Sequence, residues 1–166
     1  MAQLPNYSRM FNLIDEVFAI RNDPNQLYVD EKATKKLQAI HPATLGEIAD
    51  KNGPVVWVLM IPTTTHIMED FLSGKISEKQ ILENTEPGKS YNCIYLCSAT
   101  TLPEYRGHGQ TKKLCVDSIW KICMDHPIMN LFVWPFTADG EILAESISNE
   151  CLMKLFKKKP VKKVIK

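Results

Sequence analysis

The residues best suited to chemistry lie in a short loop at positions 102–111, Leu-Pro-Glu-Tyr-Arg-Gly-His-Gly-Gln-Thr. Gly107 and Gly109 lack a Cβ atom, so the backbone there can turn sharply and approach a ligand closely. The helix expected directly after them begins with unpaired N–H groups and the positive end of its dipole. Arg106 adds a fixed positive charge. This combination predicts a cradle for a pyrophosphate, although the glycine spacing alone fits a plain helix-capping turn equally well.

The loop resembles motif A of the GNAT superfamily of acyl-CoA-dependent N-acetyltransferases. That motif has the pattern Arg/Gln-x-x-Gly-x-Gly/Ala, usually preceded by Pro-x-Tyr, and the chain has Pro103-x-Tyr105-Arg106-x-x-Gly109-x-Thr111. The resemblance covers roughly Thr44 to Val161. It implies one α/β (α+β) domain over residues 1–166, with a mixed central sheet flanked by helices and shortened at its C-terminus.

The resemblance also implies which residues meet the co-substrate, acetyl-CoA or another acyl-CoA. The backbone near Thr101 would pair with the pantetheine arm, and the loop N–H groups would hold the pyrophosphate. On its last helix the family often has Asn, an apolar residue and Tyr on one face, where this chain has Asn149, Leu152 and Phe156. The expected contacts with the co-substrate are Thr101, Arg106, Gly107, His108, Gly109, Gln110, Thr111, Asn149 and Phe156.

The chain departs from the family pattern at three positions. Thr111 stands where the family has Gly or Ala, and its side chain crowds the phosphate approach unless its hydroxyl donates to a phosphate oxygen. Phe156 stands where many members have a Tyr that protonates the leaving thiolate. The stretch from Tyr91 to Thr101 contains no acidic residue, whereas many members place a Glu on this strand.

Acyl transfer to an amine requires that the ammonium first lose a proton. Cys93 is the nearest counterpart of the absent glutamate, but a buried inert thiol is the simpler interpretation. His66 and Glu69 could supply a base from the helices expected within 63–86, although such residues more often lie on the solvent-exposed face of a short helix. No His, Cys or carboxylate pair has metal-site spacing, so no metal is expected.

Hydrophobic periodicity predicts the elements that position this loop. An Asn52–Gly53 turn joins two strands, and a helical insertion at 63–86 precedes the motif A strand. Either these inserted helices or a partner subunit in a homodimer would form the wall of the substrate-binding site. The expected helices are Ser8–Ile20, Asp30–Ile40, Thr63–Leu72, Ser77–Asn84, Gly107–Met124 and Glu141–Lys157, and the expected strands are Thr44–Asp50, Pro54–Ile61, Tyr91–Thr101 and Ile128–Trp134, with room for a last short strand in the lysine-rich tail.

Composition excludes several classes of protein. With 45% hydrophobic and 23% charged residues in 166, the chain matches an ordinary globular domain. Its longest apolar run, Val55–Ile61, is far short of the roughly 20 residues that span a bilayer, so no membrane partner is expected. Five cysteines without a CxxC pair favour a reducing cytoplasm. The lysines after Phe156 lack interleaved aromatics and the net charge is +1, so a solvated tail is favoured over nucleic-acid binding.

The sequence therefore predicts an N-acetyltransferase that moves an acetyl group from acetyl-CoA to a primary amine on a small molecule or peptide. The alternative is a non-catalytic acyl-CoA-binding or sensing module on the same fold. The missing strand carboxylate, Phe156 and the expected short C-terminus favour that alternative. The identity of the acceptor stays open.

Overall fold

A computed structural model describes residues 4–21 and 24–159 of the chain. Its helices are α1 (Pro5–Arg21), α2 (Glu31–Ile40), α3 (Thr65–Leu72), α4 (Glu78–Asn84), α5 (Gln110–Cys123) and α6 (Ala138–Cys151). Its strands are β1 (Leu45–Asp50), β2 (Gly53–Thr63), β3 (Cys93–Thr101), β4 (Asn130–Val133) and β5 (Lys154–Lys157). Two 3₁₀ turns, η1 (Pro42–Thr44) and η2 (Pro103–Tyr105), precede β1 and follow β3.

The strands form one five-stranded mixed sheet in the order β1-β2-β3-β4-β5. β1, β2 and β3 are antiparallel neighbours, whereas β3, β4 and β5 run parallel. Each parallel step needs a crossover, and α5 and α6 supply the two crossovers. The expected α+β domain with a mixed central sheet flanked by helices is confirmed.

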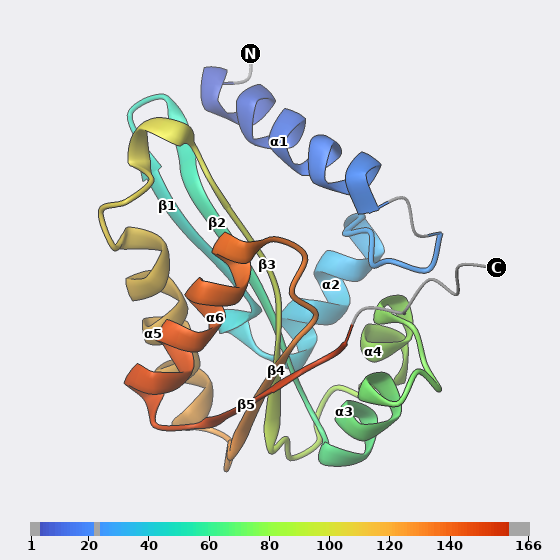
Figure 1. The fold of residues 1–166 in the computed structure, drawn as a ribbon. Helices are drawn as coiled ribbons and strands as arrows, with labels where there is room; N and C mark the ends of the chain where they lie inside the picture. Colours follow the sequence, from blue (N-terminus) through green and yellow to red (C-terminus); the bar gives the residue numbers. More distant parts are fainter. Residues whose placement is uncertain (1–3, 22–23, 160–166) are drawn as a thin grey trace, which may run out of the picture.

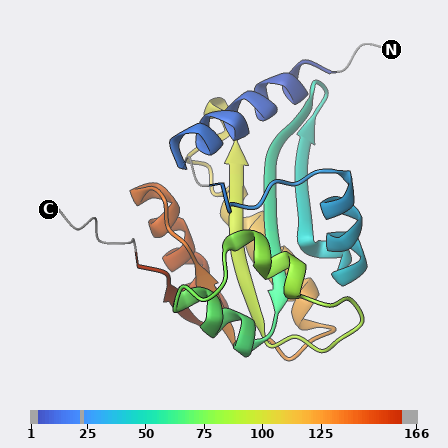
Figure 2. The same cartoon turned by 90° about the vertical axis from the view of Figure 1, so that its right-hand side faces the viewer.

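Helices cover both faces of the sheet (Figures 1 and 2). Side chains of α5 and α6 pack on one face against Val56, Val58 and Ile94. Side chains of α2, α3 and α4 pack on the other face against Tyr95 and Phe132. β2 lies between β1 and β3 and is buried along nearly its whole length, so the predicted central strand is confirmed. Helix α1 crosses the end of the sheet at the β1–β2 turn (Figure 1).

Strand β3 is paired differently along its two halves. Cys93 to Leu96 pairs with β2 on one edge and with β4 on the other. At Cys97 the register with β2 shifts, because Met60 faces Leu96 while Leu59 faces Ser98. From Cys97 to Thr101, β3 is paired only with β2 among the described residues. The sheet therefore opens between β3 and β4 beyond this bulge, a position where bulges often accompany functional sites.

The predicted local turns and caps are confirmed. Asp30 accepts a 2.8 Å hydrogen bond from the Ala33 N–H and begins α2. Ser77 and Gln80 form the expected reciprocal capping box of α4. Gly53 closes the β1–β2 turn with φ +114°, a value that favours glycine.

The prediction of one helix over Glu141–Lys157 is wrong, because α6 ends at Cys151. Leu152 adopts the left-handed conformation (φ 55°), and its N–H donates back to the carbonyls of Ser148 and Asn149. The chain then forms β5, where Leu155 pairs with Leu131. Apolar residues four apart share a face in a strand as well as in a helix, so the spacing did not distinguish the two. A non-glycine residue in the left-handed region is uncommon, and no glycine marks this helix end.

Two further predictions differ or fall outside the described chain. Helix α5 begins at Gln110, after both loop glycines, instead of at Gly107. Residues 160–166 lie outside the described residues, so the predicted shortening of the domain at its C-terminus stays a prediction. In 4–21 and 24–159, none of the helices has the length and apolar character needed to cross a bilayer.

Candidate functional site

The 102–111 loop leads from the open half of β3 into α5. The Leu102 N–H donates to the Val55 carbonyl at 2.9 Å, which holds the start of the loop against β2. Gly107 and Gly109 have φ +80° and +75°, and a Cβ atom at either position would meet nothing within 4 Å. Gly109 is the N-cap of α5 and provides no side-chain cap. The first N–H groups of α5 therefore lack a side-chain cap from Gly109, and the space beside the two glycines is open, which fits an anionic ligand.

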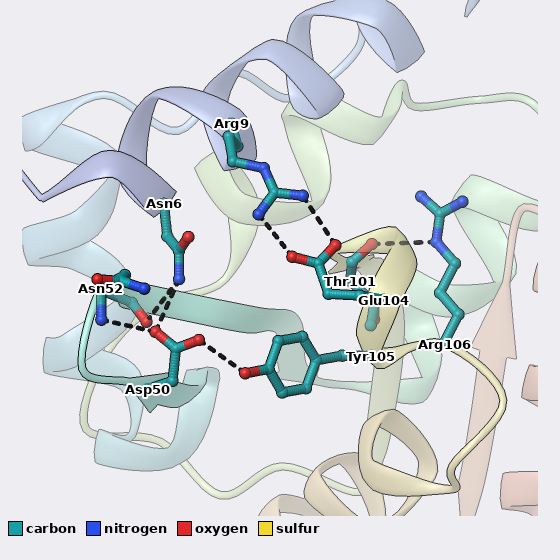
Figure 3. Close-up of polar contacts among 9 residues, drawn as sticks. Asn6, Arg9, Asp50, Asn52, Thr101, Glu104, Tyr105 and Arg106 are labelled. Atoms are coloured by element: carbon teal, nitrogen blue, oxygen red, sulfur yellow. Dashed lines mark hydrogen bonds and ion pairs between the residues drawn. The ribbon is translucent and has the colours of Figure 1, made fainter.

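A hydrogen-bonded carboxylate anchors the loop to the β1–β2 turn (Figure 3). The Tyr105 hydroxyl donates to Asp50 at 2.7 Å. Asp50 also accepts from the Asn52 N–H at 2.7 Å and from the Asn6 side chain at 2.9 Å. These bonds lower the pKa of Asp50, and the bond to Asp50 raises the pKa of Tyr105. The carboxylate thus joins α1, the turn and the loop in one polar network.

An ion pair forms the second anchor between α1 and the loop (Figure 3). The two terminal nitrogens of Arg9 donate to the two carboxylate oxygens of Glu104 at 2.5 and 2.8 Å. This bidentate geometry is the strong form of such a pair, and it lowers the pKa of Glu104 to about 2. Both side chains are nearly half exposed, so the pair contributes modestly to overall stability. Its main effect is to fix where the loop leaves β3.

Two side chains of the loop form hydrogen bonds with the last residue of β3. The Thr101 and Thr111 hydroxyls are hydrogen-bonded at 2.7 Å, so the side chain of Thr111 is turned toward the strand. Arg106 Nε donates to the Thr101 carbonyl at 3.0 Å (Figure 3). A pantetheine arm pairing with this carbonyl, as the resemblance implies, would have to replace the Arg106 bond.

The other two loop residues differ in their surroundings. His108 is exposed. Gln110 is half-buried, and its Oε1 has no hydrogen-bond partner among the described residues although it is shielded from solvent. The amide group carries both donor and acceptor atoms, so Gln110 has unused capacity at the start of α5. The unsatisfied atom is an acceptor, so this place fits a ligand that donates a hydrogen bond, such as a hydroxyl or an amide N–H.

The three candidate catalytic residues lie together at the other end of β3. Cys93 is fully buried, with Sγ 3.5 Å from Thr65 Oγ1, and burial raises its pKa. His66 and Glu69 are exposed on α3, and His66 pairs with Asp70 at 3.4 Å. A nine-residue strand is about 26 Å long at ~3.3 Å per residue, so β3 separates this group from the loop. Their catalytic role stays a prediction that the geometry does not favour.

The two residues expected from the last helix do not share a helical face. Asn149 is exposed in the last turn of α6, whereas Phe156 lies on β5 opposite Phe132. Lys154 Nζ lies 4.7 Å from the centre of the Phe156 ring. The alignment of Phe156 with a helical proton-donating Tyr is therefore wrong, because β5 begins only three residues after α6 ends.

The described residues contain no group of three or more His, Cys, Asp or Glu side chains that could hold a metal ion. All five cysteines are free thiols. The sequence did not predict that α1 would anchor the loop. Arg9 and Glu104 are 95 positions apart, and neither residue belongs to a local pattern that would pair them.

No model of a known protein family matches the sequence, and no sequence among curated proteins matches it. Among solved structures, the chain is similar in fold to Naa20 from Chaetomium thermophilum, crystallised in complex with a bisubstrate analogue. The sequences are 13% identical, the TM-score is 0.48, and the match covers 85% of this chain. The chain spans 65% of the length of the Naa20 chain. This likeness concerns the arrangement of elements and assigns no residue a role.

Proposed function

We propose that the protein is an N-acetyltransferase of the GNAT type, which transfers an acetyl group from acetyl-CoA to a primary amine of a small molecule or peptide. Residues 101–111 and the start of α5 hold the pyrophosphate and the pantetheine arm. The five free thiols agree with a reducing compartment such as the cytoplasm.

The observation that supports this proposal is the opening of the sheet directly before the glycine loop. β3 loses β4 as a neighbour after Leu96, while its backbone continues to Thr101. An extended polar ligand can pair with the open edge, as an added strand does. The uncapped start of α5 follows at the end of that edge, where the ligand's phosphates would lie.

The chemistry requires positioning more than a covalent nucleophile. The amine nitrogen attacks the thioester carbonyl carbon, the C–S bond breaks, and the amine proton leaves to solvent or a base. A backbone N–H on the open edge can polarise the carbonyl oxygen. The leaving thiolate is tolerable near neutral pH, because the pKa of a thiol is about 8.5.

A non-catalytic acyl-CoA-binding module is the second candidate, and one observation favours it. The Cys93, His66 and Glu69 group lies at the closed end of β3, away from the loop. The absence of a helical tyrosine no longer bears on this choice, because Phe156 is on β5.

Two measurements separate the candidates. A thermal shift with acetyl-CoA reports binding, and thiol release with a panel of primary amines reports transfer. We expect both for the enzyme, and binding without thiol release for the module. Absence of any thermal shift with acetyl-CoA and other acyl-CoAs would reject both.

A further inference from the structure

A groove of about 510 Å³ has the α3–α4 turn and α4 on one side and the end of β4 on the other. Trp134, directly after β4, and Lys158, directly after β5, form one wall, and Glu78 of α4 contributes to the other. The Lys158 N–H donates to the Val133 carbonyl at 2.9 Å, which fixes its backbone beside the end of β4. The long side chain of Lys158 extends from this anchored position.

The ammonium of Lys158 lies over two aromatic rings, of which Trp134 lines the groove and Phe71 is fully buried. Its Nζ is 4.3 Å from the centre of the Phe71 ring and 5.3 Å from that of the Trp134 ring. The two rings meet edge to face, with centroids 6.3 Å apart. Aromatic faces within about 6 Å attract cations through the ring quadrupole. The groove is therefore built to receive a positively charged group.

A buried carboxylate stands behind these rings. Glu78 is only 2% exposed and accepts hydrogen bonds from the Tyr95 hydroxyl at 2.6 Å and the Leu27 N–H at 2.9 Å. Tyr95 in turn packs against Phe71, with ring centroids 5.2 Å apart. A buried carboxylate favours a cation in its surroundings.

Without Lys158, the positive and negative side chains that line the groove are equal in number. Lys75 and Lys79 line it together with Glu78 and Glu83, and Lys79 pairs with Glu83 at 3.9 Å. The ammonium of Lys158 then makes the total one positive charge. A ligand with a single ammonium can replace it without changing the charge of the groove.

The groove and the glycine loop approach the sheet opening from opposite faces. Tyr95 and Cys97 face the α3–α4 side, whereas Ile94 and Leu96 face α5 and α6. Trp134 follows Val133, the last residue of β4 that pairs with β3. The open edge of β3 runs on to Thr101, and the glycine loop begins directly after it. Trp134 therefore lies where the sheet begins to open, which places the groove beside the start of the open edge.

We propose that this groove binds the acceptor as an alkylammonium ion over Phe71 and Trp134, and that Lys158 occupies the ammonium position in the ligand-free protein. The assignment as acceptor site rests on the transferase proposed above. The acceptor class is an amine that can take the place of the Lys158 side chain, of which a lysine side chain or a small alkylamine is an example. Lys158 acts as an internal competitor that the acceptor must displace.

The test uses n-butylamine, which has the length and charge of a lysine side chain, with 1-butanol as its uncharged analogue. Binding is followed by NMR on the indole N–H of Trp134, assigned with Trp134→Phe. Lys158→Met keeps the apolar stem and removes the ammonium. We expect this variant to bind n-butylamine at least about fivefold more tightly than the wild type, because the competing cation–π contacts are removed.

Lys154→Met is the matched control, since Lys154 also lies over an aromatic ring, that of Phe156, but outside the groove. It should leave the n-butylamine affinity unchanged. Equal affinities of Lys158→Met and the wild type, or equal binding of 1-butanol, would overturn the proposal. The acetyl-CoA thermal shift, measured on the same samples, reports the co-substrate site separately. A retained shift without amine binding would overturn the groove assignment alone.

Discussion

The first half of β3, Cys93 to Leu96, is paired on both edges and largely buried. Within residues 4–21 and 24–159, the second half, Cys97 to Thr101, pairs with β2 alone, and it exposes Ser98 and Ala99. The closed half holds the buried thiol of Cys93 and lies near His66 and Glu69 on α3. The open half leads to a loop whose side chains are anchored by hydrogen bonds and an ion pair.

This difference shows that residue chemistry alone does not locate a site. Burial raises the pKa of Cys93, so its thiol stays protonated and weakly reactive near neutral pH. The open half offers unpaired backbone, open space beside two glycines and the start of a helix. A large anionic ligand requires those features more than it requires a nucleophile.

The strongest test of the open half is Gly109→Val. Glycine holds φ +75° there, and a branched side chain would cost about 1–2 kcal/mol and fill the space beside the helix start. We expect complete loss of the stabilisation by acetyl-CoA, which would be about 2.7 kcal/mol at a ligand concentration of 100 Kd. Gly88→Val is the control, because Gly88 has φ +79° and equally open surroundings in a distant turn. A retained shift in Gly109→Val would place the ligand elsewhere.

A smaller effect is expected from removing one hydroxyl at each end of the strand. Tyr105→Phe loses the bond to Asp50, and Tyr91→Phe loses a 2.5 Å bond to the Glu86 carbonyl. Each change should lower the free energy of unfolding by about 1 kcal/mol. Only Tyr105→Phe should weaken acetyl-CoA binding, by about three- to tenfold, because only that bond positions the loop. Calorimetric titration compares the affinities, and equal affinities would mean that the network is purely structural.

The smallest effect concerns the pH dependence of the Arg9–Glu104 pair. The pKa of Glu104 falls from 4.5 to about 2 because Arg9 hydrogen-bonds its charged form. Its contribution to stability is therefore fully present above pH 4.5 and is lost as the pH falls through about 2. The difference in Tm between the wild type and Glu104→Gln should shrink over that window. It should also shrink in 1 M salt, because the pair is exposed. A difference that is constant with pH would contradict this role.

Much of the fold could be predicted because its determinants are local. The Asn52–Gly53 turn, the Asp30 cap and the Ser77–Gln80 capping box each depend on residues within a few positions of one another. The loop glycines were likewise recognisable from their position between a strand and a helix. Their positive φ values agree with the turn that the sequence implied.

The remainder depends on contacts between distant residues. The end of α6 at Leu152 has no glycine to mark it, and Cys151 and Leu155 fit a helix and a strand equally well. The pairing of Arg9 with Glu104 and of Tyr105 with Asp50 joins segments that only the folded sheet brings together. The separation of Cys93 from the loop depends on strand length and direction, which residue types do not reveal.

The attachment of α1 to the loop also affects how the molecule opens. Asn6 and Arg9 bind the first half of α1 to the β1–β2 turn and to Glu104. Transient unfolding of α1 must release these bonds, so α1 and the loop are expected to exchange their amide hydrogens as one cooperative unit. A ligand that binds the loop would then slow exchange in α1 without touching it. The N-terminal helix thus becomes a remote reporter of occupancy at the end of β3.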